Sequence, residues 1–382
     1  MRSWMAQVGR ALQTTWSMIG IALVLVLVLD GALDRMLRKR EDAQLRAFLD
    51  RYPDPDHSWV PEYLNEVLAE DAVDWRPYVY WRRRPYEGKY FGVDSNGLRR
   101  TWNAPPQATG KVQRIFAFGG STMWGTHVRP EYTLPSCLSR QLTGRGYHVE
   151  VTNFGEGGYV STQELITLML ELRKGNVPDV VVFYDGVNDV AASYQNAVAG
   201  WTENESNRVA EFNVDRQRSR AERLLAVFPA LRRFATGLGH HLRGPYALEA
   251  GTAAAVEADT ARVYRENVRL VSALADEYGF DTLFYWQPII HKKDHLAPNE
   301  AAAEATQAAS KDFVLGAYAA VGADAALKSR RDFHDISDMF RTTEEPVYAD
   351  FCHLSEHGNE LVARRIGEDV GGVLESRAAR SR

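Results

Sequence analysis

Cysteine is nearly absent from this sequence, which has only Cys137 and Cys352 among its 382 residues. So few cysteines exclude a disulfide-rich scaffold, and they are compatible with either side of a bacterial-type membrane. An excess of positive charge is also lacking, because 45 Lys and Arg are set against 50 Asp and Glu, for a formal net charge of -5. Without a basic field nothing draws in nucleic acid, and we expect no nucleic-acid partner.

Internal repeats and low-complexity tracts are missing as well. Disorder is not favoured, since 45% of the residues are hydrophobic and 25% are charged. A chain of this length and composition can bury a sizeable core. It therefore indicates one large domain with appendages.

One long hydrophobic run does occur, close to the N-terminus. Residues 11–29 (ALQTTWSMIGIALVLVLVL) carry no charge, and their number is close to the roughly 20 residues that a membrane-spanning helix needs. The terminal position and the flanking arginines argue against a buried core helix. A cleaved signal peptide is disfavoured because no Ala-x-Ala site follows Leu29. We predict an uncleaved, single-pass transmembrane anchor at 11–29.

The charges that flank this run bear on its orientation. The segment RMLRKR at 35–40 follows it, whereas Arg2 and Arg10 precede it. Taken literally, the positive-inside rule would place the C-terminal part of the chain in the cytoplasm. Long domains are translocated largely regardless of such charges, so the flanks leave both orientations open.

Residues 34–110 are predicted to form a stalk, an aromatic-rich cap and a linker. Residues 34–72 are charged and have helical stretches, residues 73–103 are rich in Trp and Tyr, and 104–110 (APPQATG) is typical of a linker. The turn Asp94-Ser95-Asn96-Gly97 contains the Asn-Gly pair of a β-hairpin. Such an aromatic cluster could line a sugar or lipid site, but we interpret it as a small β-rich cap packed on the main domain.

From Lys111 onward, short apolar runs alternate with helical segments. The apolar runs are VQRIFAFGG, HVEVTNFG, DVVVFYDG and DTLFYWQPII. Strands that alternate with helices indicate βαβ units, and so a parallel sheet covered on both faces. Residues 191–252 break this rhythm with polar, Arg-rich sequence and are predicted to be a lid-like insertion. We expect a three-layer α/β/α domain over 111–376.

Ser121 comes directly after the run RIFAFGG and before a helix. That position predicts a hydroxyl at the carboxyl edge of the sheet, where α/β proteins bind ligands. Two observations weaken this signal when it stands alone. Serine is a favoured helix N-cap, and the Gly-x-Ser-x-Gly elbow of α/β-hydrolases is absent because Met123 takes the place of its last glycine.

Glycines and polar residues also follow the later strands. The second run ends in Asn153-Phe-Gly-Glu-Gly-Gly158, the third in Asp185-Gly-Val-Asn188-Asp189, and Asp350-Phe-Cys-His353 lies near the C-terminus. Each fragment alone has an ordinary explanation as a turn or a cap. Taken together with Ser121, they supply every part that an acyl-transfer site requires.

These fragments resemble the four signature blocks of the SGNH hydrolase superfamily, also called the GDSL-like esterases, from about Val112 to the last helix. The resemblance implies a flavodoxin-like fold and ester cleavage without metal or cofactor, on acetylated polysaccharides, lipids or small esters. The resemblance implies that Ser121 of the first block is the nucleophile and that Gly158 and Asn188 of the second and third blocks belong to the oxyanion hole. The Asp-x-x-His of the last block corresponds to Asp350 and His353. Gly120 and Thr122 depart from the namesake Gly-Asp-Ser-Leu, and the serine itself is kept.

The chemistry of these residue types agrees with the roles. A serine hydroxyl needs a base, and a neutral imidazole such as His353 suits that task near pH 7. Asp350, three residues earlier, can hold the imidazole in the right tautomer. The backbone N–H groups of Ser121 and Gly158 and the amide of Asn188 would meet the oxyanion.

Alternatives remain open at this point. The same site would serve an O-acyltransferase in which a sugar hydroxyl replaces water, and a non-catalytic envelope protein could retain the fold. His291 and His295 lack the intervening glutamate of a zinc-protease helix, since Lys292 stands there, and Cys352 is interpreted as a packing residue. On the family resemblance we expect the catalytic domain outside the cytoplasmic membrane.

Overall fold

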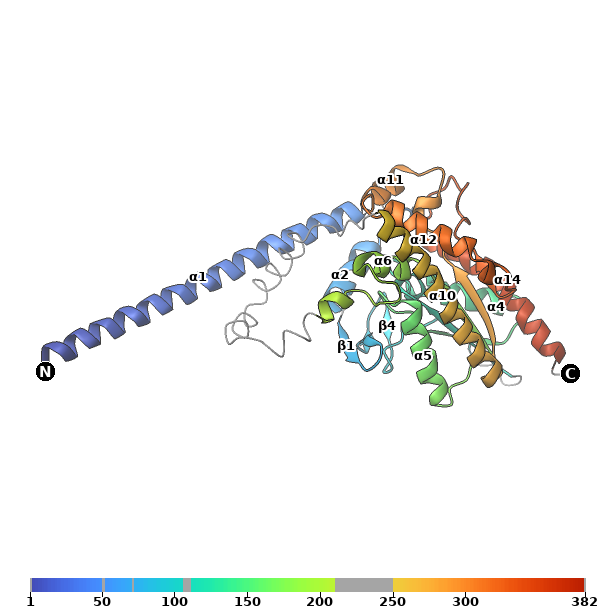
Figure 1. Cartoon of the computed structure of the whole chain (residues 1–382), viewed down its shortest axis with the longest axis horizontal. Helices are drawn as coiled ribbons and strands as arrows, with labels where there is room; N and C mark the ends of the chain where they lie inside the picture. Colours follow the sequence, from blue (N-terminus) through green and yellow to red (C-terminus); the bar gives the residue numbers. More distant parts are fainter. Residues whose placement is uncertain (1, 50–51, 71, 106–110, 210–249, 381–382) are drawn as a thin grey trace. The chain divides into compact units, whose positions relative to one another are not determined.

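The computed structural model describes residues 2–49, 52–70, 72–105, 111–209 and 250–380 (Figure 1). The chain divides into two compact units. One comprises Met1–Phe48 with Asn207–Tyr246, and the other comprises Leu49–Ser206 with Ala247–Arg382. The predicted linker at 106–110 and most of the predicted insertion, residues 210–249, lie outside the described residues.

The first unit contains α1 (Arg2–Leu49), a single helix of 48 residues. Its segment Gln13–Lys39 is long and apolar enough to cross a membrane, and none of its most apolar window is buried within the protein. At about 1.5 Å per residue, the segment exceeds the roughly 30 Å hydrocarbon core of a bilayer. The apolar helix expected from the sequence is therefore present. Signal sequences also have such a length and apolar composition, so these two properties are shared by an anchor and a signal sequence.

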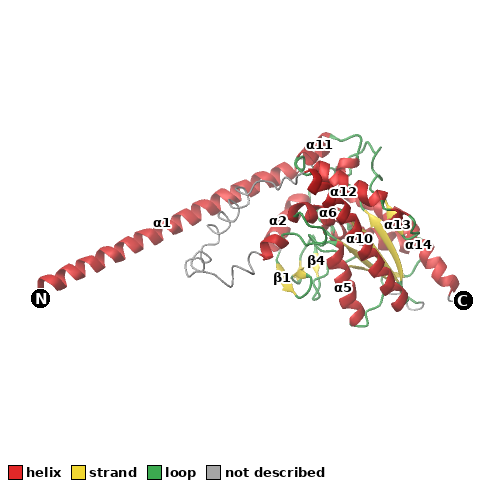
Figure 2. Ribbon diagram, in the orientation of Figure 1, coloured by secondary structure: helices red, strands yellow, loops and turns green. Residues whose placement is uncertain are grey.

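The second unit is built on a five-stranded sheet in the order β6-β5-β7-β8-β9. Figure 2 shows strands of this sheet, in yellow, among the helices that surround them, in red. All neighbouring strands pair in parallel. The strands are β5 (Gln113–Gly119), β6 (Val149–Asn153), β7 (Val180–Asp185), β8 (Asp281–Trp286) and β9 (Phe333–Asp335). This order is that of a flavodoxin-like fold, in which the chain reverses direction across the sheet at β5 and β7.

Helices cover both faces of this sheet because its strands carry apolar side chains on both sides. Phe116, Phe183 and Trp286 point into one core, with residues of α5 (Ser161–Arg173), α10 (Ala250–Tyr278) and α12 (Lys311–Ala323). Ile115 and Val182 point into the other, with residues of α4 (Leu134–Gly144) and α14 (Glu356–Arg380). The predicted three-layer α/β/α architecture is confirmed.

Shorter helices complete this domain. They are α3 (Ser121–Trp124), α6 (Val187–Asn196), α11 (Pro298–Ala305) and α13 (Ala325–Lys328), with 3-10 turns at Pro130–Tyr132 and Ile290–Lys292. Helix α14 packs on α4, and α10 packs on α12 and α6. The helices α3 and α6 each begin two residues after the last residue of β5 and β7, which puts their first turns at the carboxyl edge of the sheet.

The aromatic region before the sheet forms α2 (Val60–Glu70) and two small antiparallel pairs. Strand β1 (Val73–Arg76) pairs with β2 (Tyr80–Arg83), and β3 (Tyr86–Glu87) pairs with β4 (Gly92–Val93). After β4, Asp94 Oδ1 accepts from the backbone N–H of Asn96 and Leu98 at 2.8 and 2.9 Å, and Gly97 adopts φ 82°. This turn brings Val93 and Arg99 into an antiparallel bridge.

Candidate active site

Ser121 is the first residue of α3, immediately beyond β5. The residue at the N-cap is Gly120, and no side chain caps this helix. The alternative that Ser121 serves only as a cap is therefore wrong. Instead its Oγ lies 2.7 Å from His353 Nε2.

His353 joins Ser121 to Asp350. The Nδ1 of His353 lies 2.6 Å from Asp350 Oδ2, and Asp350 Oδ1 accepts from the backbone N–H of Cys352 and His353 at 2.9 and 2.7 Å. Two backbone donors thus orient the carboxylate within one local turn. The three residues singled out in the sequence lie in one line of hydrogen bonds, although 232 positions separate the serine from the histidine.

The carboxyl group of Asp350 is ionised in this setting. Burial disfavours its charged form, but the charge of His353 and hydrogen bonds from His127 and His353 outweigh burial and hold the pKa of Asp350 well below its usual range. Cys352 differs, because burial raises the pKa of its thiol well above the ordinary value. Its thiol is buried and inert, and both Cys137 and Cys352 are free.

His127 is a neighbour of this group that the sequence did not reveal. Its Nε2 lies 3.4 Å from Asp350 Oδ2, and its ring meets that of His353 edge-on with centroids 5.2 Å apart. The residue has a left-handed backbone with φ 69°. Burial lowers the pKa of its imidazole, which is neutral near pH 7.

The backbone of His127 is clamped by two tyrosines from the segment before the cap. Tyr52 Oη donates to its carbonyl at 2.6 Å, and its N–H donates to Tyr63 Oη at 3.0 Å. A histidine six residues after the nucleophile was the only available signal in the sequence. Sequence spacing could not show that the turn at Gly125, with φ 97°, directs it back to Asp350.

The proposed oxyanion residues share one pocket with Ser121. This pocket of about 280 Å³ is lined by Ser121, Gly158, Asn188, Ala191, Ala192, Gln195, Glu203 and Phe351. Gly158 has φ 74°, a conformation that favours glycine. Within the described residues, the backbone N–H of Ser121 and that of Gly158 donate to no protein acceptor. The pocket therefore has donors left for a ligand.

Asn188 and Gly120 fit against each other beside the nucleophile. The Nδ2 of Asn188 donates to the Tyr159 carbonyl at 2.7 Å, which leaves its second N–H for a ligand. A Cβ built on Gly120 would lie 1.9 Å from that nitrogen. The glycine at this position, where the namesake motif has aspartate, makes room for the asparagine amide.

Asp189 ties the Asn188 turn to the start of the preceding helix, α5. Its carboxylate accepts from the hydroxyl of Ser161 at 2.5 Å and from the backbone N–H of Ser161 at 3.2 Å. Two more fully buried carboxyl groups, Asp185 and Glu164, lie near it. Burial raises the pKa of Asp185 to about 8 and that of Asp189 to about 6, and it raises the pKa of Glu164 as well.

The cap holds the loop that carries Gly158. Trp81 Nε1 donates to the Gly157 carbonyl at 2.9 Å, and Tyr159 Oη donates to the Trp81 carbonyl. Arg82 Nη1 donates to the carbonyls of Phe154 and Gly155 at 3.2 and 3.4 Å. Packing of the cap on the main domain was expected, but its contact with this loop was not.

Among the described residues, one group of three has side chains close enough to share a metal ion, and it consists of His127, Asp350 and His353. The ring nitrogens of His353 already contact Ser121 and Asp350. An ion bound there would therefore compete with the hydrogen bond to the serine. His291 contacts Glu304 at 3.3 Å instead.

The chain matches one family model and is similar to several solved structures. The family model of the GDSL-like lipase/acylhydrolase matches residues 115–366. No curated protein sequence matches the chain. Among solved structures, an acetyl xylan esterase is 15% identical, with a TM-score of 0.38, over 67% of this chain and 99% of that one.

Two further solved structures are similar to a comparable degree. A variant of an acetyl-xylooligosaccharide esterase from Geobacillus stearmophilus is 14% identical, with a TM-score of 0.40, over 69% of this chain and 95% of that one. A lipase/acylhydrolase from Enterococcus faecalis is 18% identical, with a TM-score of 0.35, over 68% and 96%.

Proposed function

Because the chain belongs to the GDSL-like lipase/acylhydrolase family, it is an ester-hydrolysing enzyme, and we propose that it works through an acyl-serine intermediate on Ser121. The observation that carries this proposal is the unbroken line of hydrogen bonds from Ser121 Oγ through His353 to Asp350. In this proposal His353 is the base and Asp350 orients it.

The first half of the reaction forms the acyl-enzyme. His353 Nε2 takes the proton of Ser121 Oγ as the oxygen attacks the ester carbonyl, and Asp350 stabilises the imidazolium. The tetrahedral oxyanion is met by the N–H groups of Ser121 and Gly158 and by the free N–H of Asn188. His353 then returns the proton to the alcohol as the ester bond breaks.

The second half releases the acid. Water gives a proton to His353 Nε2 and attacks the acyl carbonyl, and the same three donors hold the second oxyanion. When the intermediate collapses, Ser121 regains the proton. Every step uses backbone or side-chain groups of this chain together with the ester and water, so the mechanism requires no metal and no cofactor.

The acyl and alcohol sides of the pocket differ in character. Ala191, Ala192 and Phe351 give one part an apolar lining in which a short acyl chain fits, whereas Gln195 and Glu203 are polar. Glu203 lies beside the oxyanion glycine, because its Oε2 is 2.5 Å from where a Cβ on Gly158 would be. We infer that the alcohol is a polar, hydroxylated one such as a sugar.

Labelling tests the proposal directly. A fluorophosphonate should modify Ser121, and peptide mapping identifies the modified residue. An aryl-ester series of increasing chain length should show turnover falling beyond short acyl groups. Equal labelling of the Ser121→Ala protein would refute the assignment of the nucleophile, and a flat chain-length profile would refute the short acyl pocket.

Transfer of the acyl group to a sugar hydroxyl would use the same acyl-enzyme. The polar side of the pocket, with Gln195 and Glu203, is the observation that favours this second candidate. Adding a saccharide acceptor to the aryl-ester assay separates the two activities. A transferase forms acylated saccharide in preference to free acid, whereas a hydrolase forms free acid at an unchanged rate.

We further propose that α1 anchors the enzyme in a membrane with the catalytic domain on the extracytoplasmic side. The segment Gln13–Lys39 supports the anchor by its length and apolar composition. Reporter fusions after residue 60 and at the C-terminus test the orientation. Cytoplasmic-type signals at both positions would overturn it, and a processed N-terminus would show a signal sequence instead of an anchor.

A further inference from the structure

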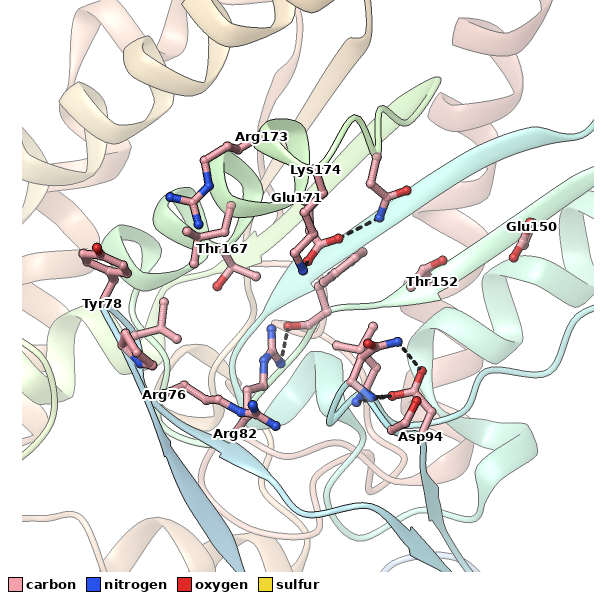
Figure 3. A pocket seen from close by; sticks show the side chains of 18 residues that line it. Arg76, Tyr78, Arg82, Asp94, Glu150, Thr152, Thr167, Glu171, Arg173 and Lys174 are labelled. Atoms are coloured by element: carbon pink, nitrogen blue, oxygen red, sulfur yellow. Dashed lines mark hydrogen bonds and ion pairs between the residues drawn. The ribbon is translucent and has the colours of Figure 1, made fainter.

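A second pocket, of about 770 Å³, lies between the β1–β2 hairpin, the edge strand β6 and helix α5 (Figure 3). Ser121, Gly158 and Asn188 are not among the residues that line it. The reaction proposed above uses none of its side chains. Its lining combines arginines with hydroxyl and aromatic groups.

Arg82 extends into this pocket from β2 (Figure 3). It is only 5% exposed. Its Nη1 donates to the carbonyls of Phe154 and Gly155 and lies 3.8 Å from Glu156 Oε2, so its charge is paired. Its buried Nη2 has no hydrogen-bond partner among the described residues. A buried donor of a charged group without an acceptor is costly, so this nitrogen favours an acceptor supplied by a ligand.

Two more arginines add positive charge to the same lining. The Nε of Arg76 is also buried without an acceptor, and within the described residues neither Arg76 nor Arg173 forms an ion pair. Two of the pocket's carboxylates are already occupied. Glu171 binds Lys174 and Asn176 at 2.6 and 2.7 Å, and Asp94 holds its own turn. A third carboxylate, that of Glu150, also lines the pocket. Among the described residues, the guanidinium groups of Arg76 and Arg173 are thus the ones in this lining without an ion-pair partner.

The other residues that line the pocket indicate which kind of molecule the anionic group belongs to. Thr152 and Thr167 place hydroxyl groups in the wall, and Tyr78 stands at the rim with 69% of its surface exposed (Figure 3). Guanidinium groups pair with planar carboxylates or with phosphate through two parallel hydrogen bonds. An exposed aromatic face with nearby hydroxyls suits the apolar face and hydroxyl rim of a sugar ring.

We propose that this pocket binds an anionic saccharide, with its carboxylate or phosphate held by Arg76, Arg82 and Arg173 and its sugar ring against Tyr78. The anionic saccharide has one of two sources. It is either a part of the substrate polysaccharide distant from the ester that is cleaved, or a separate glycan. Because Arg82 also holds the loop that carries Gly158, occupancy of the pocket is linked to the oxyanion loop in both cases.

Calorimetric titration of the full chain in detergent micelles tests this site. The probes are a galacturonate tetrasaccharide, the neutral galactose tetrasaccharide and inorganic phosphate. The charged tetrasaccharide should bind and the neutral one should not, and salt should weaken binding. Arg76→Gln and Arg173→Gln should each weaken binding about tenfold or more, as expected for loss of a charge-assisted hydrogen bond.

Arg84→Gln is the matched control. Arg84 lies in the same cap but pairs with Asp74 at 2.7 Å and does not line the pocket, so its loss should leave binding within about twofold. Arg82→Gln should abolish binding. If the Arg82→Gln protein fails to fold, Arg76→Gln and Arg173→Gln still test the site, because both side chains lie on the pocket wall without other ion pairs.

The outcomes separate the possible sources of the anion. Tighter binding of the acidic tetrasaccharide than of phosphate supports the saccharide, whereas binding of phosphate alone overturns the sugar part of the proposal. Equal binding of both tetrasaccharides, or no binding of any of the three probes, overturns it entirely. If the ester substrate carries the anion, Arg76→Gln raises KM for an acidic acetylated glycan but not for an aryl ester.

Fluorophosphonate labelling of Ser121 should be the same in the Arg76→Gln and wild-type proteins. This readout keeps failure of the saccharide site distinct from failure of the proposed nucleophile.

Discussion

His127 Nε2 and His353 Nδ1 approach the same oxygen of Asp350, at 3.4 and 2.6 Å. One carboxylate therefore faces two imidazoles. Tyr52 and Tyr63 clamp His127, so the segment before the cap holds the second imidazole that contacts Asp350.

His127 should act as a positioning residue for Asp350. His127→Ala should lower turnover about ten- to a hundredfold, the loss expected for one hydrogen bond to a charged group, with little change in KM. His127→Gln keeps an N–H donor and should recover part of that loss. Steady-state kinetics on one aryl ester measure both. A rise in KM at unchanged turnover would instead make His127 a substrate contact.

Removal of Ser121 or His353 should abolish nearly all ester cleavage without unfolding the protein, because the two act as one unit. Asp350→Ala should leave more residual activity than either change. Cys352→Ala is the control within the same turn, since burial makes its thiol inert. Ester cleavage and circular dichroism are measured for all four variants. If Cys352→Ala lost as much ester cleavage as Ser121→Ala, the triad would be contradicted.

Asn188→Ala should cost about a hundred- to a thousandfold in turnover with little change in KM, the usual loss for one oxyanion-hole donor. The change also leaves the Tyr159 carbonyl without its amide donor, so a small fall in melting temperature is expected. Asp189→Ala should lower the melting temperature more, because it releases Ser161. An increase in KM alone for Asn188→Ala would rule out the oxyanion hole as described.

Replacement of Asp185 by Asn should stabilise the protein in a pH-dependent way. Burial raises the pKa of Asp185 from 3.8 to about 8. The folded state therefore keeps a proton that the unfolded state loses, and the stability contributed by Asp185 falls as pH rises between these values. Asp185→Asn should raise the melting temperature little near pH 4 and increasingly up to about pH 8.

Melting curves of both proteins from pH 4 to pH 9 measure this difference. Asp338→Asn is a suitable control, since the pKa of that partly exposed carboxyl is lowered, not raised, with hydrogen bonds from Lys292 and Arg341 outweighing burial. A difference between Asp185→Asn and wild type that stays constant with pH would contradict a protonated Asp185.

The sequence alone determined the parts of this protein that depend on local pattern. Apolar runs such as VVVFYD appear as the wholly buried strand β7, because a parallel strand covered on both faces has no polar side. Residues that follow successive strands must meet at one edge of the sheet, so Ser121, Gly158 and Asn188 could be grouped before any coordinates. Their roles, like the domain boundaries, remain predictions.

The tertiary structure alone decided which distant side chains meet. Nothing in the spacing shows that His127 turns back to Asp350, that Trp81 and Arg82 bind the loop 154–159, or that Gly120 makes room for the Asn188 amide. These contacts depend on how the cap and the loops pack, and packing is a matter of shape between segments far apart in the chain. Local periodicity carries no information about such contacts, which is why both the second histidine and the arginine-lined pocket emerged only from the folded chain.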